Sequence, residues 1–298
     1  PATSVVWAID VGTARSGACF TLPSHPEHFF AGLVATDQVV KIPTNILIDR
    51  ASKQLVAFGE DAINKYHAGG EESEAKYVLF ERFKMQLYRD NKPLTERPTV
   101  KSVCGSVEIS AVDAFGYAFQ YFCECAKQIL ATSAKTYHLD DIQWVITVPA
   151  IWSDGAKQVM VEAAKQGGLT GDESKITLCL EPTAASMWAF RTLSKEDPLV
   201  VTPGTKCLTV DAGGGTVDIM LFEILADQEI KKLAPESGGD WGSTVIDREF
   251  EHMLESVFGK EVMEDFRKSQ PIDYHQLLRD FESLKLTVVP EDAKDSTK

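Results

Sequence analysis

The 298-residue sequence contains no apolar run that approaches the roughly 18 residues needed to cross a bilayer. Its first apolar stretch, Val5 to Ile9, is too short for the core of a signal peptide and follows no basic residue. Positive charge is also scarce, with 30 basic against 44 acidic side chains and a formal net charge of −14. Because neutralising a phosphate backbone requires clustered lysine and arginine, this composition excludes a protein that coats nucleic acid.

Cysteine is sparse and predicts neither a disulfide framework nor a metal site. The six cysteines include no CxxC pair, and Cys123 and Cys125 are two apart on an expected helix, which points them to different sides. The six histidines have no spacing typical of metal ligands, so core or surface roles are expected for them. A reducing, cytoplasmic location is therefore the expectation.

Two segments of the chain resemble each other. Val5–Thr13 is followed by an apolar run, and Cys207–Thr216 is followed by the apolar run Val217–Ile224. Each is typical of a buried strand, an aspartate at its end, a glycine turn and a second strand. With a length that predicts about two domains, this duplication indicates two related lobes facing each other across a cleft.

Strands alternate with helices between and after the two copies, which favours an α/β architecture. Apolar side chains at a helical period predict a helix from Val112 to Ala131, with Asp113 suited to its start. The other expected elements are a hairpin within Lys41–Phe58, a strand at Gln143–Val148, a helix capped by Asp154 that stops at Gly167–Gly168, a strand at Ile176–Leu180, a helix from Pro182 through Leu193, a helix capped by Ser243 that ends at Gly259, and a last helix over Tyr274–Leu286. Lys195–Thr205 is expected to separate the lobes, because it is rich in proline and polar residues.

The strongest local signal is the turn Asp211-Ala-Gly213-Gly214-Gly215-Thr216, directly after an apolar strand. Three consecutive glycines destabilise a strand but let main-chain N–H groups approach a charged ligand closely, and phosphate is the natural occupant. Asp211 would repel a phosphate unless a cation lay between them, so it is expected to bind Mg²⁺ through water. Asp10-Val-Gly12-Thr13 repeats the pattern with fewer glycines. The alternative for both is an ordinary hairpin turn with a capping aspartate.

Six ordered motifs run almost from end to end of the chain. They are Ile9–Thr13, Phe80–Met85, Trp144–Trp152, Leu180–Ser186, Val210–Asp218 and Ser237–Gly242. Together they resemble the nucleotide-binding domain of the 70-kDa heat-shock chaperones, within the actin and sugar-kinase superfamily, and the pattern is nearest to the divergent family-member-12 branch. The resemblance implies an α/β, two-lobed actin-like ATPase fold of the ribonuclease H-like type. It also implies that the two hairpins hold the β- and γ-phosphates of ATP or ADP together with Mg²⁺.

The resemblance implies a division of the chain into lobes. Lobe I is expected at 1–200, with a core at about 1–40 and 112–200 and an outer subdomain at about 41–111; part of the lobe II core follows at 201–244, and the start of its outer subdomain at 245–298. The family's later adenosine-binding segment and its peptide-binding domain have no match. The second lobe is therefore expected to be incomplete and the chain to be part of a longer polypeptide, with an exposed lobe II face able to drive self-association.

Carried over residue by residue, the resemblance implies a role for each matched position. Lys84 would approach the γ-phosphate and the attacking water, Glu181 would orient metal-bound water, and Thr216 would offer a hydroxyl near the γ-phosphate. Asp10 and Asp211 would hold Mg²⁺ through water, and Asp211 would share in catalysis. The implied nucleotide-binding residues are Gly12, Thr13, Ala14, Arg15, Gly213, Gly214, Gly215, Thr216, Gly242, Ser243, Glu282 and Lys285. From the residues alone, the alternatives are an exposed charge for Lys84 and a helix-stabilising acid for Glu181.

The sequence departs from the family pattern at two places. The first hairpin reads Gly12-Thr13-Ala14-Arg15 where the family has Gly-Thr-Thr-Tyr, so a hydroxyl is lost and a guanidinium gained. Arg15 either contacts phosphate or pairs with a surface carboxylate. In the helix that clasps adenosine, Leu286 stands where an arginine commonly stacks on adenine. The loss of that cation–π contact weakens the expectation of adenine selectivity.

Three functions fit these patterns. The leading one is an ATP-binding, Mg²⁺-dependent, slowly hydrolysing chaperone-type ATPase switch, in which nucleotide state opens and closes the lobes. One alternative is a nucleotide-responsive interaction module with little or no hydrolysis, which Ala14, Arg15 and Leu286 motivate. The other is a small-metabolite kinase of the same superfamily. The chaperone-like segment Leu180–Ala185 argues against the kinase. Expected partners are nucleotide and protein clients or co-chaperones. For the isolated chain, weak binding and little turnover are expected.

Overall fold

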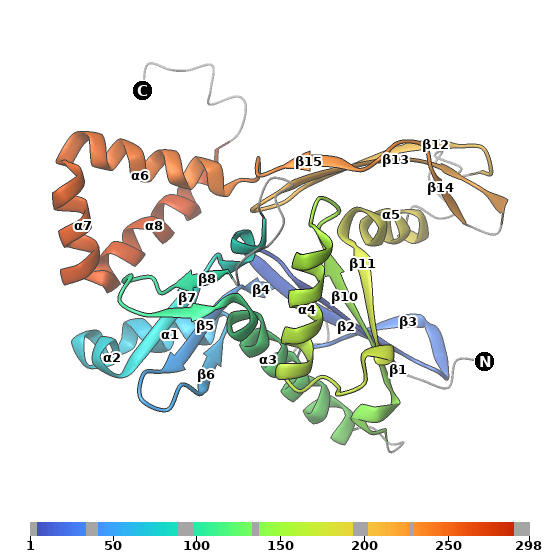
Figure 1. Ribbon diagram of the computed structural model, residues 1–298, viewed down its shortest axis with the longest axis horizontal. Helices are drawn as coiled ribbons and strands as arrows, with labels where there is room; N and C mark the ends of the chain where they lie inside the picture. The colour runs from blue at the N-terminus through green and yellow to red at the C-terminus, as the bar shows by residue number, and fades with distance from the viewer. Residues whose placement is uncertain are drawn as a thin grey trace.

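The first 180 residues of the chain are built around a six-stranded sheet, and a second, four-stranded sheet follows later in the computed structural model (Figure 1). The structure describes residues 5–33, 41–88, 98–132, 137–192, 202–226 and 229–288. The strands of the first sheet are β1 (Val5–Val11), β2 (Arg15–Leu22), β3 (His25–Ala31), β4 (Ile42–Pro43), β10 (Ile142–Val148) and β11 (Ile176–Leu180). Their order is β11-β10-β1-β2-β3, with β4 paired to β2. Strands β1, β10 and β11 run parallel, whereas β1 and β2 form the predicted antiparallel hairpin.

Two long helices, α3 (Ala111–Ala131) and α4 (Asp154–Gln166), pack against each other beside the first sheet (Figure 1). Phe115, Phe119 and Phe122 recur at helical spacing on α3 and are completely buried in the main hydrophobic core. The helical period therefore predicted both the helix and the face that it buries.

The start of α4 differs from the prediction. Ser153 is the N-cap, because its backbone is extended and its hydroxyl accepts the N–H of Ala156. Asp154, which was expected to cap the helix, is instead its first residue, where a carboxylate still interacts favourably with the helix dipole. The helix ends before Gly167, as predicted.

A smaller outer sheet, in the order β6-β5-β7, lies beyond the first sheet. This region consists of β5 (Asn45–Asp49), β6 (Leu55–Phe58), α1 (Glu60–Ala68), α2 (Gly70–Lys76), β7 (Tyr77–Glu81), the 3-10 helix η1 (Phe83–Leu87) and the hairpin β8 (Thr99–Lys101) and β9 (Glu108–Ser110). The β5–β6 pair confirms the predicted hairpin within Lys41–Phe58. The helices α1 and α2 were not predicted, because two turns of helix carry too little periodicity to stand out in a sequence.

The second sheet carries the second copy of the hairpin. Its strands are β12 (Lys206–Ala212), β13 (Val217–Ile224), β14 (Ile230–Lys232) and β15 (Ser237–Gly239). Helix α5 (Glu181–Thr192) packs against β12 and β13 (Figure 1). The β12 residues on the side facing away from α5 are exposed, with Leu208 at 64% and Val210 at 56%. The sheet therefore presents an apolar surface on this side.

Three helices end the described part of the chain: α6 (Thr244–Phe258), α7 (Lys260–Ser269) and α8 (Pro271–Lys285). They pack around a small core formed by Leu254, Met263, Tyr274 and Leu278. Helix α6 ends before Gly259 as predicted, and α8 begins three residues before the expected start, whereas α7 was not predicted.

The N-cap of α6 does not match the prediction fully. Ser243 occupies the N-cap position, but its backbone is already helical and its side chain caps no N–H group. Ile246, Met253 and Val257, which lie on one face of this helix, are each more than half exposed. The apolar period of this helix therefore lies largely at the surface.

The expected division at 200 and 244 stays a prediction. Residues 193–200, which hold most of the expected linker and the expected end of the helix at Leu193, lie outside the described residues. Short 3-10 turns, η2 (Leu139–Asp141) and η3 (Glu173–Lys175), precede β10 and β11. Within the described ranges, no helix combines the length and apolar composition needed to cross a bilayer. All six cysteines are free thiols.

Candidate functional site

Polar side chains gather where β1, β10 and β11 end. These strands are parallel, so their carboxyl ends lie at one edge of the first sheet, the usual place for a ligand site in such sheets. Asp10 is near the end of β1, Thr147 is near the end of β10, and Glu181 directly follows β11. The Thr147 hydroxyl donates to Asp10 Oδ1 at 2.7 Å. The topology therefore brings together residues far apart in the sequence.

Lys84 reaches the same edge from η1. The chain turns sharply before it, because Arg82 adopts a left-handed backbone with φ of 52°. The Lys84 side chain is almost completely buried and forms an ion pair with Glu181. Its Nζ lies 5.9 Å from the centre of the Trp152 ring. The alternative of an exposed charge for Lys84 is therefore wrong.

The Lys84–Glu181 pair combines a fixed charge with a group that titrates. Burial raises the pKa of the Glu181 carboxyl to about 7, against the opposing effect of Lys84. Burial would lower the pKa of the Lys84 ammonium, but the carboxylates of Glu181 and Asp10 together raise it. Lys84 thus stays positive at neutral pH, while Glu181 can gain or lose a proton there. Such a pairing is suited to acid–base chemistry beside a developing negative charge.

Asp10 is held on both of its oxygens. Thr147 donates to one, and the ammonium of Lys41 forms an ion pair with the other. Burial alone would raise the pKa of the Asp10 carboxyl, but Lys84 and Lys41 lower it below its usual range. Arg15 donates from its guanidinium to the carbonyl of Lys41 at 3.3 Å. Among its described contacts, Arg15 therefore supports the lysine beside Asp10 and does not pair with a surface carboxylate.

The two glycine turns, Gly12–Ala14 and Gly213–Gly215, meet each other. A Cβ atom on Gly215 would lie 2.3 Å from both Thr13 Oγ1 and Met85 Sδ. A Cβ atom on Gly214 would lie 3.1 Å from the Cβ of Ala14. A side chain at position 215 would force Thr13 or Met85 to move, and the contact joins the two sheets at the candidate site.

Asp211 and Asp218 are cross-strand neighbours at the base of the second turn. Asp218 is almost completely buried, and its Oδ1 accepts the N–H groups of Ala150 at 2.8 Å and Ile151 at 3.4 Å, in the loop after β10. It thereby fixes the second hairpin to the first sheet. Burial raises the pKa of the Asp211 carboxyl, and the charges of Asp218 and Asp10 raise it further. A cation placed among these carboxylates would relieve their repulsion.

The start of α6 supports the second turn. The N–H groups of Gly242, Ser243 and Thr244 donate to the three carbonyls of Gly213–Gly215 at 2.8–3.1 Å. A Cβ atom on Gly242 would lie 2.4 Å from the Gly214 carbonyl oxygen, so this approach also requires glycine. These N–H groups therefore hold the shape of the turn.

Lys285 belongs to an ion-pair network behind the start of α6. Its Nζ donates to Asp247 Oδ1 at 2.5 Å and to the Ser243 carbonyl at 3.3 Å. Arg82 pairs with the other oxygen of Asp247 at 3.2 Å. Because Asp247 is only 4% exposed, the two cations compensate a buried charge and tie α8, α6 and the outer sheet together.

The structure brings most of the predicted site residues into one region. Those that meet at the turns and the sheet edge are Asp10, Gly12, Thr13, Ala14, Lys84, Glu181, Asp211, Gly213, Gly214, Gly215 and Thr216, with Gly242 and Ser243 behind them. Arg15 and Lys285 lie at its margins through the contacts given above. Glu282 lies on α8 and is half-buried, and Leu286 is 71% exposed.

Sequence reasoning missed several residues of this region, namely Lys41, Arg82, Thr147, Asp218 and Asp247. Thr147, Asp218 and Arg82 lie inside the six motifs, and for Thr147 and Asp218 the position at a strand end was the available signal. Lys41 and Asp247 carry no local pattern, because their importance depends on partners at least 31 residues away.

The donor set fits a hydrated hard cation. Carboxylate oxygens from both turns, at Asp10 and Asp211, are the ligand type that Mg²⁺ prefers, and Mg²⁺ usually keeps several waters. Across the described residues, no group of three or more histidine, cysteine, aspartate or glutamate side chains is arranged to hold a metal ion. The glycine turns offer closely approaching backbone of the kind that binds phosphate.

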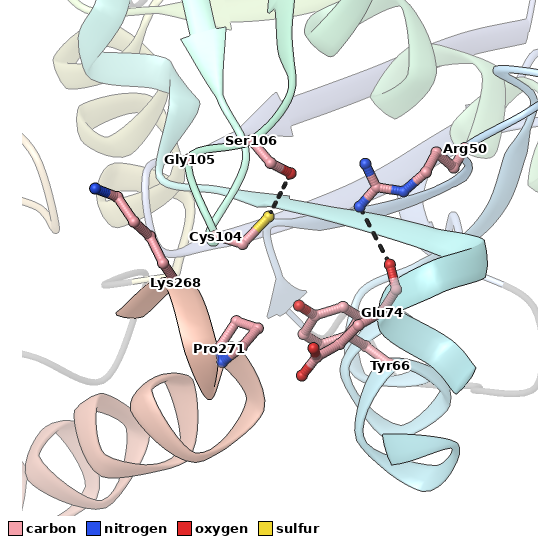
Figure 2. A pocket seen from close by; sticks show the side chains of 8 residues that line it. All are labelled: Arg50, Tyr66, Glu74, Cys104, Gly105, Ser106, Lys268 and Pro271. Carbon is pink, nitrogen blue, oxygen red and sulfur yellow. Dashed lines mark hydrogen bonds between the residues drawn. The ribbon is translucent and has the colours of Figure 1, made fainter. Parts of the chain in front are cut away.

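A separate pocket of about 310 Å³ lies between the outer sheet region and the corner of α7 and α8 (Figure 2). It is lined by Arg50, Tyr66, Glu74, Cys104, Gly105, Ser106, Lys268 and Pro271. Arg50 donates to the carbonyl of Glu74 at 3.1 Å, and the Cys104 thiol lies 2.9 Å from the Ser106 hydroxyl. None of the predicted site residues lines this pocket, so it is distinct from the candidate site.

Comparison with known proteins agrees with the motifs. The family profile described as Hsp70 protein matches residues 111–295. The chain is 32% identical to Heat shock 70 kDa protein 12A of Mus musculus, over 96% of this chain and 50% of that protein. It is 30% identical to Heat shock 70 kDa protein 12B of Homo sapiens, over 97% of this chain and 50% of that protein. The chain thus spans about half the length of these relatives.

Among solved structures, MreB5 of Spiroplasma citri bound to ADP matches with a TM-score of 0.51, covering 99% of this chain and 82% of that one. At 12% sequence identity, this likeness shows the fold alone, and it confirms the predicted actin-like ATPase fold. The profile match and the identity to both relatives over nearly the whole chain confirm the resemblance seen in the six motifs. The chain therefore belongs to the Hsp70 family.

Proposed function

We propose that the chain binds ATP or ADP with Mg²⁺ at the two glycine turns and forms the ATPase part of a chaperone-type switch. The observation that carries this proposal is the convergence of the buried Lys84–Glu181 pair with the aspartate-bearing turns of both sheets. Membership of the Hsp70 family supports nucleotide binding. The MreB5 structure of the same fold was solved with ADP bound.

Asp10 and Asp211 would hold Mg²⁺, chiefly through its water ligands. When bound, the ion supplies positive charge that neutralises the phosphates and polarises the transferred phosphoryl group. The site needs that charge, because Asp10, Glu181, Asp211 and Asp218 outnumber its two lysines. A nucleotide without the cation would meet net repulsion.

Lys84 would offset negative charge on the transferred phosphoryl group, since its ammonium is buried and held in place by Glu181. Glu181, with a pKa near 7, would orient the attacking water or take its proton. Thr216 would add a hydroxyl at the second turn. These roles use the geometry of side chains that the fold has already fixed.

The backbone would hold the remainder of the nucleotide. Gly12–Arg15 and Gly213–Thr216 would contact the phosphates, and Glu282 and Lys285 would lie toward the nucleoside. Gly242 and Ser243 would act by fixing the second turn, because their N–H groups donate to its carbonyls. A nucleotide gripped by turns of two different sheets would favour the approach of the two lobes, which is the basis of a switch.

Protein clients or co-chaperones in the cytoplasm would receive this signal in the longer protein. The exposed β12 face, with Leu208 and Val210, supports a further proposal that lobe II self-associates when it is left uncovered. Sedimentation velocity of the wild type and of Leu208→Ser would test it, with the substitution expected to shift the chain toward monomer. A wild-type chain that is monomeric at all concentrations would contradict this proposal.

Calorimetry of ATP and ADP binding, with and without Mg²⁺, beside a phosphate-release assay tests the nucleotide proposal. Asp211→Asn and Lys84→Ala should each reduce phosphate release by the longer protein about 100-fold or more. Lys206→Ala, an exposed lysine on β12, serves as the matched control and should not. Unchanged turnover in both site variants would contradict the catalytic assignment. Tight binding without release in the wild type would favour the interaction module, and ADP production that depends on a small-molecule substrate would favour the kinase.

A further inference from the structure

A partly buried chain of hydrogen-bonded side chains connects α8 to the outer sheet region. His67 on α1 and His275 on α8 are 208 positions apart, yet His67 Nε2 lies 2.8 Å from His275 Nδ1. The other ring nitrogen of His275, Nε2, lies 2.8 Å from Glu81 Oε2 at the end of β7. His275 is 1% exposed, and the two rings meet edge to face with centroids 5.1 Å apart.

Glu81 is the acceptor at one end of this chain. Burial would raise the pKa of the Glu81 carboxyl, but His275 lowers it to about 2, so it is an acceptor at any ordinary pH. His275 Nε2 therefore donates to Glu81. The 2.8 Å contact between His275 Nδ1 and His67 Nε2 needs one donor and one acceptor, so only one of these two nitrogens carries a hydrogen.

Protonation of both rings is incompatible with this chain. With each imidazole doubly protonated, two N–H donors would face each other across the 2.8 Å contact. Burial lowers the pKa of His67, and the neighbouring His275 and Arg279 lower it further. The hydrogen-bonded arrangement therefore favours neutral His67.

The charged and polar groups around the histidines come from three elements. Helix α1 contributes Glu60 and β7 contributes Glu81, with Arg82 directly after it; helix α8 contributes Asp273, Gln276 and Arg279. Arg279 pairs with Glu60 at 3.3 Å and Arg82 pairs with Asp247 at 3.2 Å. Gln276 and Asp273 raise the pKa of His67, but burial, His275 and Arg279 together lower it by more.

Apolar packing and an ion pair also join α8 to this region. The small core under α1, formed by Leu47, Ala62, Tyr66 and Leu79, receives Ile272 from α8. Directly beside it, the pocket of about 310 Å³ separates the β8–β9 turn from Pro271 at the start of α8 (Figure 2). The polar chain therefore acts together with Ile272 and the Arg279–Glu60 pair in holding α8.

We propose that Glu81, His275 and His67 form a proton-sensitive latch, which holds α8 against α1 and β7 near neutral pH and releases it in mild acid. The direction of the pH dependence follows from the linkage between protonation of His67 and the latched state. His67 has a lowered pKa when latched and an ordinary value of about 6.5 when released. The latch is therefore at full strength above about pH 6.5 and weakens as pH falls below it, because the released state takes up the proton first.

Amide hydrogen exchange of the full chain tests the latch without any nucleotide, so its failure is distinguishable from failure of the proposed function. Protection of α8 amides, corrected for intrinsic rates, is compared at about pH 7.5 and about pH 5.5. The wild type should lose up to about tenfold protection between these two pH values, because the lower one lies about one pH unit below the ordinary pKa of His67. Amides of β10, in the first sheet, should not respond.

His67→Gln separates titration from structure, because its amide can still donate a hydrogen bond to His275 or accept one from it, but cannot take up a proton. This variant should keep its α8 protection at both pH values. His252→Gln, at an exposed histidine on α6, is the matched control and should respond like the wild type. Equal loss of protection in His67→Gln and wild type, or no loss in the wild type, would overturn the proposal.

Histidine ring nitrogen shifts of the wild type provide a measurement that needs no variant. His67 should titrate below the ordinary histidine pKa of about 6.5. A His67 midpoint at or above that value would overturn the latch even where the hydrogen-exchange variants proved unstable.

Discussion

The two halves of the molecule start from the same hairpin pattern but bury it differently. In the first sheet, Trp7 on β1 and Trp144 on β10 have no exposed surface, and α3 and α4 complete the core. In the second sheet, α5 packs on β12 and β13, while Leu208 and Val210 remain more than half exposed. A repeated sequence pattern therefore specifies the local turn and strands, whereas burial depends on what later packs against them.

The largest expected effect tests the buried ion pair of the first half. Lys84→Ala should lower the free energy of unfolding by about 3–5 kcal/mol, because it leaves the Glu181 carboxyl buried without its cation. Urea denaturation measures the change. Lys84→Ala combined with Glu181→Gln should be less destabilised than the single variant, since no uncompensated charge remains. A double variant that is weaker than the single one would show that the pair is not the cause.

A matched pair of leucines tests the difference in burial directly. Leu79→Ala on the buried strand β7 should cost about 2–5 kcal/mol, through lost apolar contact and the cavity left behind. Leu208→Ala on β12 should change stability by no more than about 0.5 kcal/mol, because that side chain is 64% exposed. Thermal unfolding of both variants checks the comparison. Similar losses at the two sites would show that the β12 face is covered in solution.

The contact between the turns is the next test. Gly215→Ala should destabilise the chain by about 1–3 kcal/mol, because the new methyl group would overlap Thr13 and Met85. Gly213→Ala is the matched control, since its Cβ atom would lie 3.4 Å from the Thr216 carbonyl oxygen, an ordinary contact. Differential scanning calorimetry compares the two. Equal stability of both variants would mean that the two turns are apart in solution.

Local patterns predicted the elements that carry a strong period. The hairpins, α3 and the strand β10 could be predicted because alternate or helical spacing of apolar residues is visible in a short window. The helices α1, α2 and α7 are short, and α7 buries only Met263 completely enough to count as core. Such segments depend on tertiary packing more than on their own sequence.

The candidate site, too, could be predicted only in part. The three consecutive glycines indicated the second turn and Asp211. The sequence around Lys84 alone indicated an exposed charge, so the family resemblance was needed to predict that Lys84 belongs to the site. The Glu81–His275–His67 chain could not be predicted at all, since its members are separated by as many as 208 positions and meet only through the packing of α8. Long-range polar contacts of this kind leave no local signal.

The smallest expected effect returns to a lysine–glutamate pair, now in the second half. Lys232 and Glu236 form an ion pair, but the lysine side chain is 48% exposed, in contrast to Lys84. Lys232→Ala should cost less than about 1 kcal/mol, and about 1 M salt should remove most of that difference by screening. Urea denaturation at low and high salt measures both quantities. Because the same two residue types form both pairs, a loss as large as that of Lys84→Ala would show that residue type, and not burial, sets the strength of the pair.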